Sequence, residues 1–197
     1  MSASGDGQPP AASDRSPGLD SRAIVSAALD IIAERGVPGL SMRVLSERLG
    51  VSLGATYRHV PNKNELLRLV AADLYARVKP ADDCDDEFEQ AKRVMLQIHD
   101  LLAAYPGMAA HIAQNVPEFY SASVAGLISN PLQAAGLSRS EADRIVFALV
   151  LLNAGHMLFR VPPELEGEAA AAFDAGVDLI LRGARLSRQR RSVNTVD

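Results

Sequence analysis

The 197-residue sequence predicts an all-α protein, and two observations support that prediction. Hydrophobic residues make up 48% of the chain but aromatic residues only 5%, so Ala, Leu and Val supply most of the apolar side chains, a mixture that favours helices over strands. Apolar residues also recur at helical spacing along most of the chain, between turns marked by glycine and proline. The length suits a small module joined to a larger one.

Charge divides the chain into two parts. Residues 41–79 contain seven basic and three acidic residues, whereas residues 80–181 contain five basic and fifteen acidic residues. The simplest description is a basic N-terminal module on an acidic helical body. We therefore expect a disordered arm rich in Ser, Gly and Pro over 1–18, the basic module over 19–79, the body over 80–187 and a polar tail over 188–197.

The module begins and ends with helices that have recognisable caps. Asp20 is a suitable N-cap for a first helix, and Gly36 ends that helix. Asn62, with Glu65 three residues later, resembles a capping box and predicts the start of a further amphipathic helix over residues 63–78.

Between these two helices lie two shorter ones. Ser41 caps a helix over residues 42–49, which Gly50 ends by adopting positive φ. A three-residue turn follows, and then a helix over Leu53–His59 that Pro61 closes. Helix, tight glycine turn and helix is the spacing of a helix-turn-helix.

The body is predicted to continue as helices. Ser138 and Glu141 form a capping box before a helix that is apolar on nearly every side, so this helix must be buried within a bundle or against another subunit. The expected helices cover residues 87–105, 106–115, 117–136, 141–160 and 164–186.

In a helix-turn-helix the second helix lies in the major groove, where its outward residues meet base edges while flanking groups hold phosphates. Gly54 lets the backbone approach DNA closely. The alternative is that Tyr57 packs between helices and Lys63 is only solvated. Our candidates for base contact are Ser52, Leu53, Gly54 and Arg58, and those for contact with the DNA backbone are Ser41, Arg43, Thr56, Tyr57, His59 and Lys63.

The stretch AALDIIAERGVPGLSMRVLSERLGVSLGATYRHVPNKNELL resembles the DNA-binding domain of the TetR family of bacterial transcriptional regulators, over about residues 21–77. Thr56 departs from the family pattern, which has Leu or Ile there, so either the helix is less firmly packed or the hydroxyl reaches a phosphate. The features that carry the resemblance are Glu34 and Gly36, Leu40 and Ser41, Leu49 to Ser52, Tyr57 to His59, and Asn62, Lys63, Leu66 and Leu67.

The resemblance implies a homodimer formed by the last two long helices, here residues 141–160 and 164–186. It also implies a repressor that binds a near-palindromic operator in double-stranded DNA and is released by a small-molecule effector held in the body. Scattered polar and aromatic residues on apolar helices suggest a largely hydrophobic effector. Our candidates for its pocket are His99, His111, Gln114, Asn115, Phe119, Asn153, His156 and Met157.

Other classes of protein receive less support from the sequence. We find no Ser/His/Asp set, phosphate loop or close carboxylate pair, so a helical enzyme is a minor alternative and we expect neither a cofactor nor a bound metal. Two further alternatives are an effector-independent DNA-binding regulator and a purely protein-binding dimerisation module. A single cysteine, Cys84, and the lack of a long apolar segment lead us to expect a cytoplasmic protein without a membrane helix.

Overall fold

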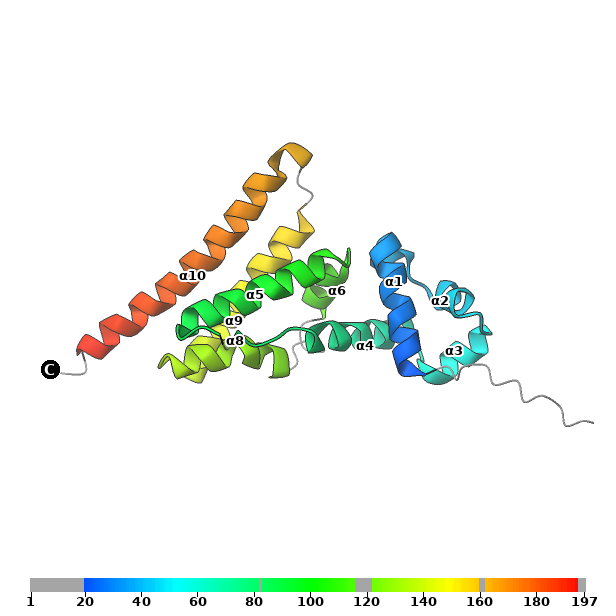
Figure 1. The fold of residues 1–197 in the computed structure, drawn as a ribbon, viewed down its shortest axis with the longest axis horizontal. Coiled ribbons are helices and arrows are strands. Elements are labelled where there is room, and N and C mark those ends of the chain that lie inside the picture. The colour runs from blue at the N-terminus through cyan, green and yellow to red at the C-terminus, as the bar shows by residue number, and fades with distance from the viewer. Residues whose placement is uncertain (1–19, 82, 116–121, 160–161, 195–197) are drawn as a thin grey trace, which may run out of the picture.

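The computed structural model describes residues 20–81, 83–115, 122–159 and 162–194, and these residues form helices and turns without any strand, which confirms the all-α prediction. Helices of the N-terminal module lie at one end of the molecule and those of the body at the other (Figure 1). The module comprises α1 (Ser21–Gly39), α2 (Met42–Leu49), α3 (Leu53–His59) and α4 (Lys63–Ala76); the body comprises α5 (Glu87–Ala103), α6 (Met108–Gln114), α8 (Ala122–Ala134), α9 (Arg139–Leu158), a short 3₁₀ turn η1 (Pro163–Leu165) and α10 (Glu166–Asn194).

Capping side chains fix the limits of the module helices. The Asp20 carboxylate accepts the backbone N–H of Ala23 at 2.7 Å, and Asn62 accepts the N–H of Glu65 at 2.8 Å, so α1 and α4 begin where the sequence predicts. Gly36, with φ of 67°, breaks the helical path inside α1. The glycine therefore interrupts the helix as predicted, although a last turn continues beyond it.

The predicted bounds of the helix-turn-helix are confirmed. Ser41 caps α2 and Ser52 caps α3, each through its hydroxyl oxygen, and Gly50 adopts φ of 65° at the end of α2. The left-handed conformation at Gly50 turns the chain so that α3 packs across α2.

The body is a layered helical bundle. Helix α8 packs on α5 and α9, while α10 packs along α9 and crosses α5. The capping box of Ser138 and Glu141 is present at the start of α9. Helix α10 continues to Asn194, through most of the segment expected to be a polar tail. Gln and Arg, which recur in this segment, are good helix formers, and the positive charge of Arg suits a helix C-terminus.

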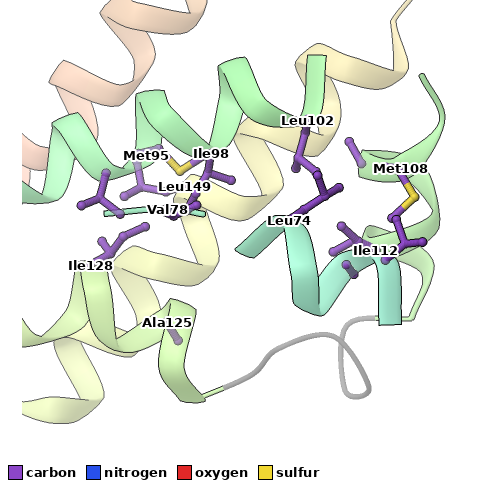
Figure 2. Close-up of a cluster of buried hydrophobic side chains, with 14 of the residues drawn as sticks. Leu74, Val78, Met95, Ile98, Leu102, Met108, Ile112, Ala125, Ile128 and Leu149 are labelled. Atoms are coloured by element: carbon purple, nitrogen blue, oxygen red, sulfur yellow. The ribbon is translucent and has the colours of Figure 1, made fainter. Parts of the chain in front are cut away.

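One apolar core runs from the module into the body. Leu74 of α4, Leu102 of α5 and Ile112 of α6 belong to a single cluster of buried side chains, which Figure 2 shows around the junction of these helices. Leu74 is completely buried. Since α4 contributes to both the module and this junction, it is the element through which the two parts share packing.

Within the described residues, no helix combines the length and the apolar character that crossing a bilayer requires.

Candidate functional site

Helix α3 exposes most of its side chains, although several are apolar or aromatic. Leu53 and Tyr57 are 43% and 46% exposed, and Arg58 is exposed on the same short helix. A Cβ built on Gly54 would find no atom from beyond its own stretch of helix backbone within 4 Å, so the backbone there is open to an incoming surface. Four of the predicted base-contact and backbone-contact residues therefore lie together on the outward side of α3.

Ser52 lies at the exposed N-terminus of this helix. Its hydroxyl oxygen accepts the N–H of Ala55 at 3.2 Å, which leaves the hydroxyl hydrogen available to donate outward. The same geometry recurs at Ser41, whose hydroxyl caps α2 while the residue stays exposed. Both predicted contact residues combine a structural cap with a free donor.

Two further candidates for contact with the DNA backbone, Arg43 and His59, are exposed. Arg43 forms an exposed ion pair with Glu47 at 3.1 Å, one turn along α2. Exposed pairs of this kind contribute little to stability, so the guanidinium can exchange its partner for a phosphate at little cost.

The predicted contact of Thr56 with the DNA backbone is contradicted by the structure. It is completely buried, and its hydroxyl lies 2.7 Å from the hydroxyl of Ser46 on α2. A side chain with no exposed surface does not contact a phosphate in this conformation. The other interpretation, a loosely packed helix, is also replaced by a specific polar contact between α2 and α3.

Lys63, at the start of α4, is half-buried and its ammonium donates to the backbone carbonyl of Val37 at 2.8 Å. Partial burial lowers the pKa of Lys63 from its ordinary value. An ammonium has three N–H groups, so the bond to Val37 leaves others for a phosphate. Lys63 is thus more than a solvated charge, because it also joins α4 to the end of α1.

Several basic residues of the module are paired with carboxylates, which the charge count along the sequence did not reveal. Arg48 binds both carboxylate oxygens of Glu34, at 3.0 and 2.6 Å, and these bonds lower the pKa of Glu34. Arg68 is paired with Glu65 in the same way. Among the described residues Arg58 takes part in no ion pair, which leaves its full charge available to a ligand.

The module is tied to the body by a contact between α1 and the α5–α6 loop, made by Val37, Pro106 and Gly107. The N–H of Val37 donates to the carbonyl of Pro106 at 2.9 Å. Gly107 has φ of 90°, and a Cβ there would lie 3.1 Å from Cβ of Val37. Sequence reasoning missed this α1–body contact, because a backbone hydrogen bond between distant segments leaves no residue pattern.

Three of the predicted pocket residues meet in the body, together with Phe173 of α10, which was not among the predicted pocket residues. His99 Nδ1 of α5 lies 2.8 Å from Oδ1 of Asn153 on α9, and the His99 ring stacks on Phe173 of α10 at 4.0 Å. The His156 ring is 4.9 Å from His99. Burial, and secondarily the nearby His99, lower the pKa of His156 from its ordinary value. We call these four residues the imidazole cluster.

The remaining pocket candidates lie elsewhere. His111 and Gln114 are on α6, Asn115 caps its C-terminus and donates to the His111 carbonyl at 2.8 Å, and Met157 packs against the core from α9. Phe119 lies outside the described residues.

A groove of about 430 Å³ borders the imidazole cluster, lined by Leu151, Leu152, Gly155, His156, Phe159, Ala169, Ala172 and Phe173.

Helices α9 and α10 expose a row of large apolar side chains. Leu151 is 56% and Leu179 76% exposed. A second hollow of about 810 Å³ follows α9 past Phe147 and Leu151. Exposed apolar surface on this scale marks an interaction face. Its members are Phe147, Leu151, Leu158, Leu179 and Leu186.

Comparison with known proteins gives one consistent result. Residues 24–70 match the sequence profile described as bacterial regulatory proteins, tetR family. The chain is 37% identical over 59 residues to the class D tetracycline repressor protein of Escherichia coli, a match covering 30% of this chain and 27% of that repressor. It is 29% identical over 154 residues to the class C repressor of E. coli, covering 76% of this chain and 70% of the relative.

Solved structures extend the likeness to the body. The crystal structure of a TetR variant from Acinetobacter baumannii AYE in complex with minocycline has a TM-score of 0.73 and 26% identity, covering 87% of this chain and 99% of that one. The match to the profile, the longer alignment with the class C repressor and the shared architecture agree. Residues 24–70 thus carry the DNA-binding domain of the TetR family of bacterial regulatory proteins, and the rest of the chain resembles members of that family in architecture.

Proposed function

We propose that this protein is a dimeric transcriptional repressor that binds a near-palindromic operator and is released from it by a small-molecule effector. The observation that carries the proposal is the outward side of α3, where Leu53, Gly54 and Arg58 are exposed on a two-turn helix set against α2. Apolar and basic side chains together suit the major groove, which presents thymine methyl groups and guanine acceptors. Repression is inferred from the similarity to the tetracycline repressor proteins.

Dimerisation is supported by the apolar row on α9 and α10. Leu151 and Leu179 would remain in water in a monomer. A two-fold interface between these helices buries them and places two copies of α3 on one face of a duplex. The spacing that such a dimer reads is one helical turn of DNA, about 34 to 36 Å, or a multiple of it.

Effector binding is assigned to the body at the imidazole cluster and its adjoining groove. His156 and Phe173 line that groove, which otherwise consists of aliphatic and aromatic side chains. A mainly apolar site with a few ring nitrogens and an amide suits a largely hydrophobic molecule with some polar groups. The related A. baumannii protein was crystallised with minocycline, a precedent for a small organic effector.

Two connections would carry the effector signal to the module. Helix α4 shares the apolar core with α5 and α6, and the α1–body contact fixes the end of α1 to the α5–α6 loop. A shift of α5 or α6 therefore moves both α1 and α4. An effector that favours the shifted arrangement moves the population away from the spacing that DNA requires.

Operator binding is tested by a gel-shift titration with the intergenic DNA upstream of the gene, at two salt concentrations. Leu53→Ala/Arg58→Ala is the test variant, since both side chains are exposed and their removal leaves the core intact. Arg93→Ala on α5 is the control for loss of one positive charge. We expect specific retention that weakens with salt, is lost in the double variant and persists in the control. Equal retention of operator and random DNA by the unchanged protein contradicts the proposal.

A further inference from the structure

Helix α3 has one buried side chain, Thr56, within a range that the structure describes completely. Its other residues are exposed or half-buried. The helix that carries the proposed DNA-contacting side chains thus has one fully buried side chain, and this side chain makes a polar contact with α2. In α2, the partner Ser46 is buried as well, with 4% exposure.

The hydrogen atoms of these two hydroxyl groups have a defined arrangement. Ser46 Oγ lies 2.7 Å from the carbonyl oxygen of Met42, and a carbonyl can only accept. The single hydroxyl hydrogen of Ser46 therefore points to Met42, and Thr56 must donate its own hydrogen to Ser46 Oγ across 2.7 Å. The result is a directed chain from Thr56 to Ser46 to the Met42 carbonyl.

We propose that these two linked hydrogen bonds make Ser46 and Thr56 positioning residues, which set the angle of α3 relative to α2 for the recognition of DNA sequence. Both oxygens are attached directly to Cβ, so one side-chain torsion on each residue fixes the link. Apolar packing would tolerate a slide or rotation of α3, whereas a hydrogen bond depends on distance and direction. Small errors in the placement of a binding group remove much of its contribution to the free energy of binding.

The inference rests on the proposed operator binding, but one of its tests does not. In the free protein, amide hydrogen exchange reports how firmly α3 is held. We expect the N–H of Val60, which donates to the Thr56 carbonyl at 3.0 Å, to exchange about tenfold faster in Ser46→Ala/Thr56→Val, the scale of one net hydrogen bond. Unchanged protection of the α3 amides would overturn the positioning role without any reference to DNA.

The second test measures specificity. Duplexes are selected by the wild-type protein from a random library, and dissociation constants are compared with those for a scrambled duplex. In Ser46→Ala/Thr56→Val we expect about tenfold weaker binding of the selected duplex and about the same binding of the scrambled one, because the exposed phosphate contacts remain. Failure of the wild type to select any sequence would instead count against operator binding itself.

Single variants test the direction of the hydrogen bonds from Thr56 to Ser46 and from Ser46 to Met42. Ser46→Ala leaves the buried Thr56 donor without its acceptor, so we expect it to lower the melting temperature more than Thr56→Val, which leaves the bond from Ser46 to Met42 intact. Thr56→Ser retains the hydroxyl and should retain the specificity ratio to within about threefold. A Thr56→Ser variant as unspecific as Thr56→Val, or a double variant as specific as the wild type, would show that the pair only fills space.

Discussion

Gly54 is the residue at which the demands of folding and of DNA binding differ most clearly. It lies within α3, where glycine is less favourable than alanine, yet a Cβ placed there would have no atom within 4 Å from beyond its own stretch of helix backbone. Packing within the protein therefore does not require glycine at this position. We infer that the absence of a side chain serves the close approach of DNA instead.

Gly54→Ala should therefore fold at least as well as the wild type and bind operator less well. We expect a gain in stability of about 0.5 to 1 kcal/mol from helix propensity, and a loss of operator affinity of about tenfold. Calorimetry and fluorescence anisotropy measure the two effects. The matched variant Gly167→Ala, also in open space but on α10, should leave DNA binding unchanged. Full operator affinity in Gly54→Ala would contradict the close approach.

His156 gives the molecule a pH-dependent stability. Its folded pKa lies below the ordinary value of 6.5, first through burial and then through His99. The unfolded chain thus binds a proton more readily, so the contribution of neutral His156 is present above pH 6.5 and is lost as the pH falls through the folded pKa. Melting temperatures between about pH 7.5 and pH 5 should fall more steeply for the wild type than for His156→Gln. Parallel curves would show that His156 titrates as in the unfolded chain.

At the scale of elements, the α1–body contact decides how the module is held. Gly107→Ala forces a side chain into left-handed backbone and against Val37, at a cost of about 1 to 3 kcal/mol. We expect a lower melting temperature, faster exchange of the Val37 amide and weaker operator binding.

Gly136→Ala is a closely matched control. Gly136 has φ of 92°, but the nearest atoms to its built Cβ belong to the Arg188 side chain, away from the module. It should show a similar loss of stability with normal exchange at Val37 and normal specificity. If both variants weaken operator binding equally, backbone strain rather than the α1–body contact explains the effect.

For the whole molecule, the apolar row on α9 and α10 predicts the oligomeric state. Leu151→Glu places a charge on a side chain that is 56% exposed in the single chain and buried in the proposed dimer. Light scattering after size exclusion should give about half the wild-type mass. Leu53→Glu on α3, which is 43% exposed, is the control and should keep the wild-type mass. A dimeric Leu151→Glu variant would place the interface elsewhere.

The helix-turn-helix could be predicted closely from the sequence because its limits are set locally. Ser41, Gly50 and Ser52 are adjacent to the backbone groups that they satisfy or turn, so residue type and position suffice. The family resemblance was confirmed for the same reason, since its motifs are short and local.

Other features depend on contacts between distant segments. The prediction for Thr56 was wrong because threonine occurs both on protein surfaces and in buried polar contacts. Only its distance from Ser46 in the folded protein distinguishes the two. Phe173 was missed as a partner of His99, since 74 positions separate them and apolar periodicity does not identify which rings will stack. Base contacts, effector pocket and dimer remain predictions.

Hydroxyl-radical footprinting on a duplex selected by the wild-type protein shows whether two copies of α3 read successive major grooves. We expect two protected half-sites related by two-fold symmetry, with centres about 10 to 10.5 base pairs apart or a multiple of that spacing. Both should disappear in Leu53→Ala/Arg58→Ala. A single protected patch, or protection that persists in the double variant, would contradict this mode of DNA binding.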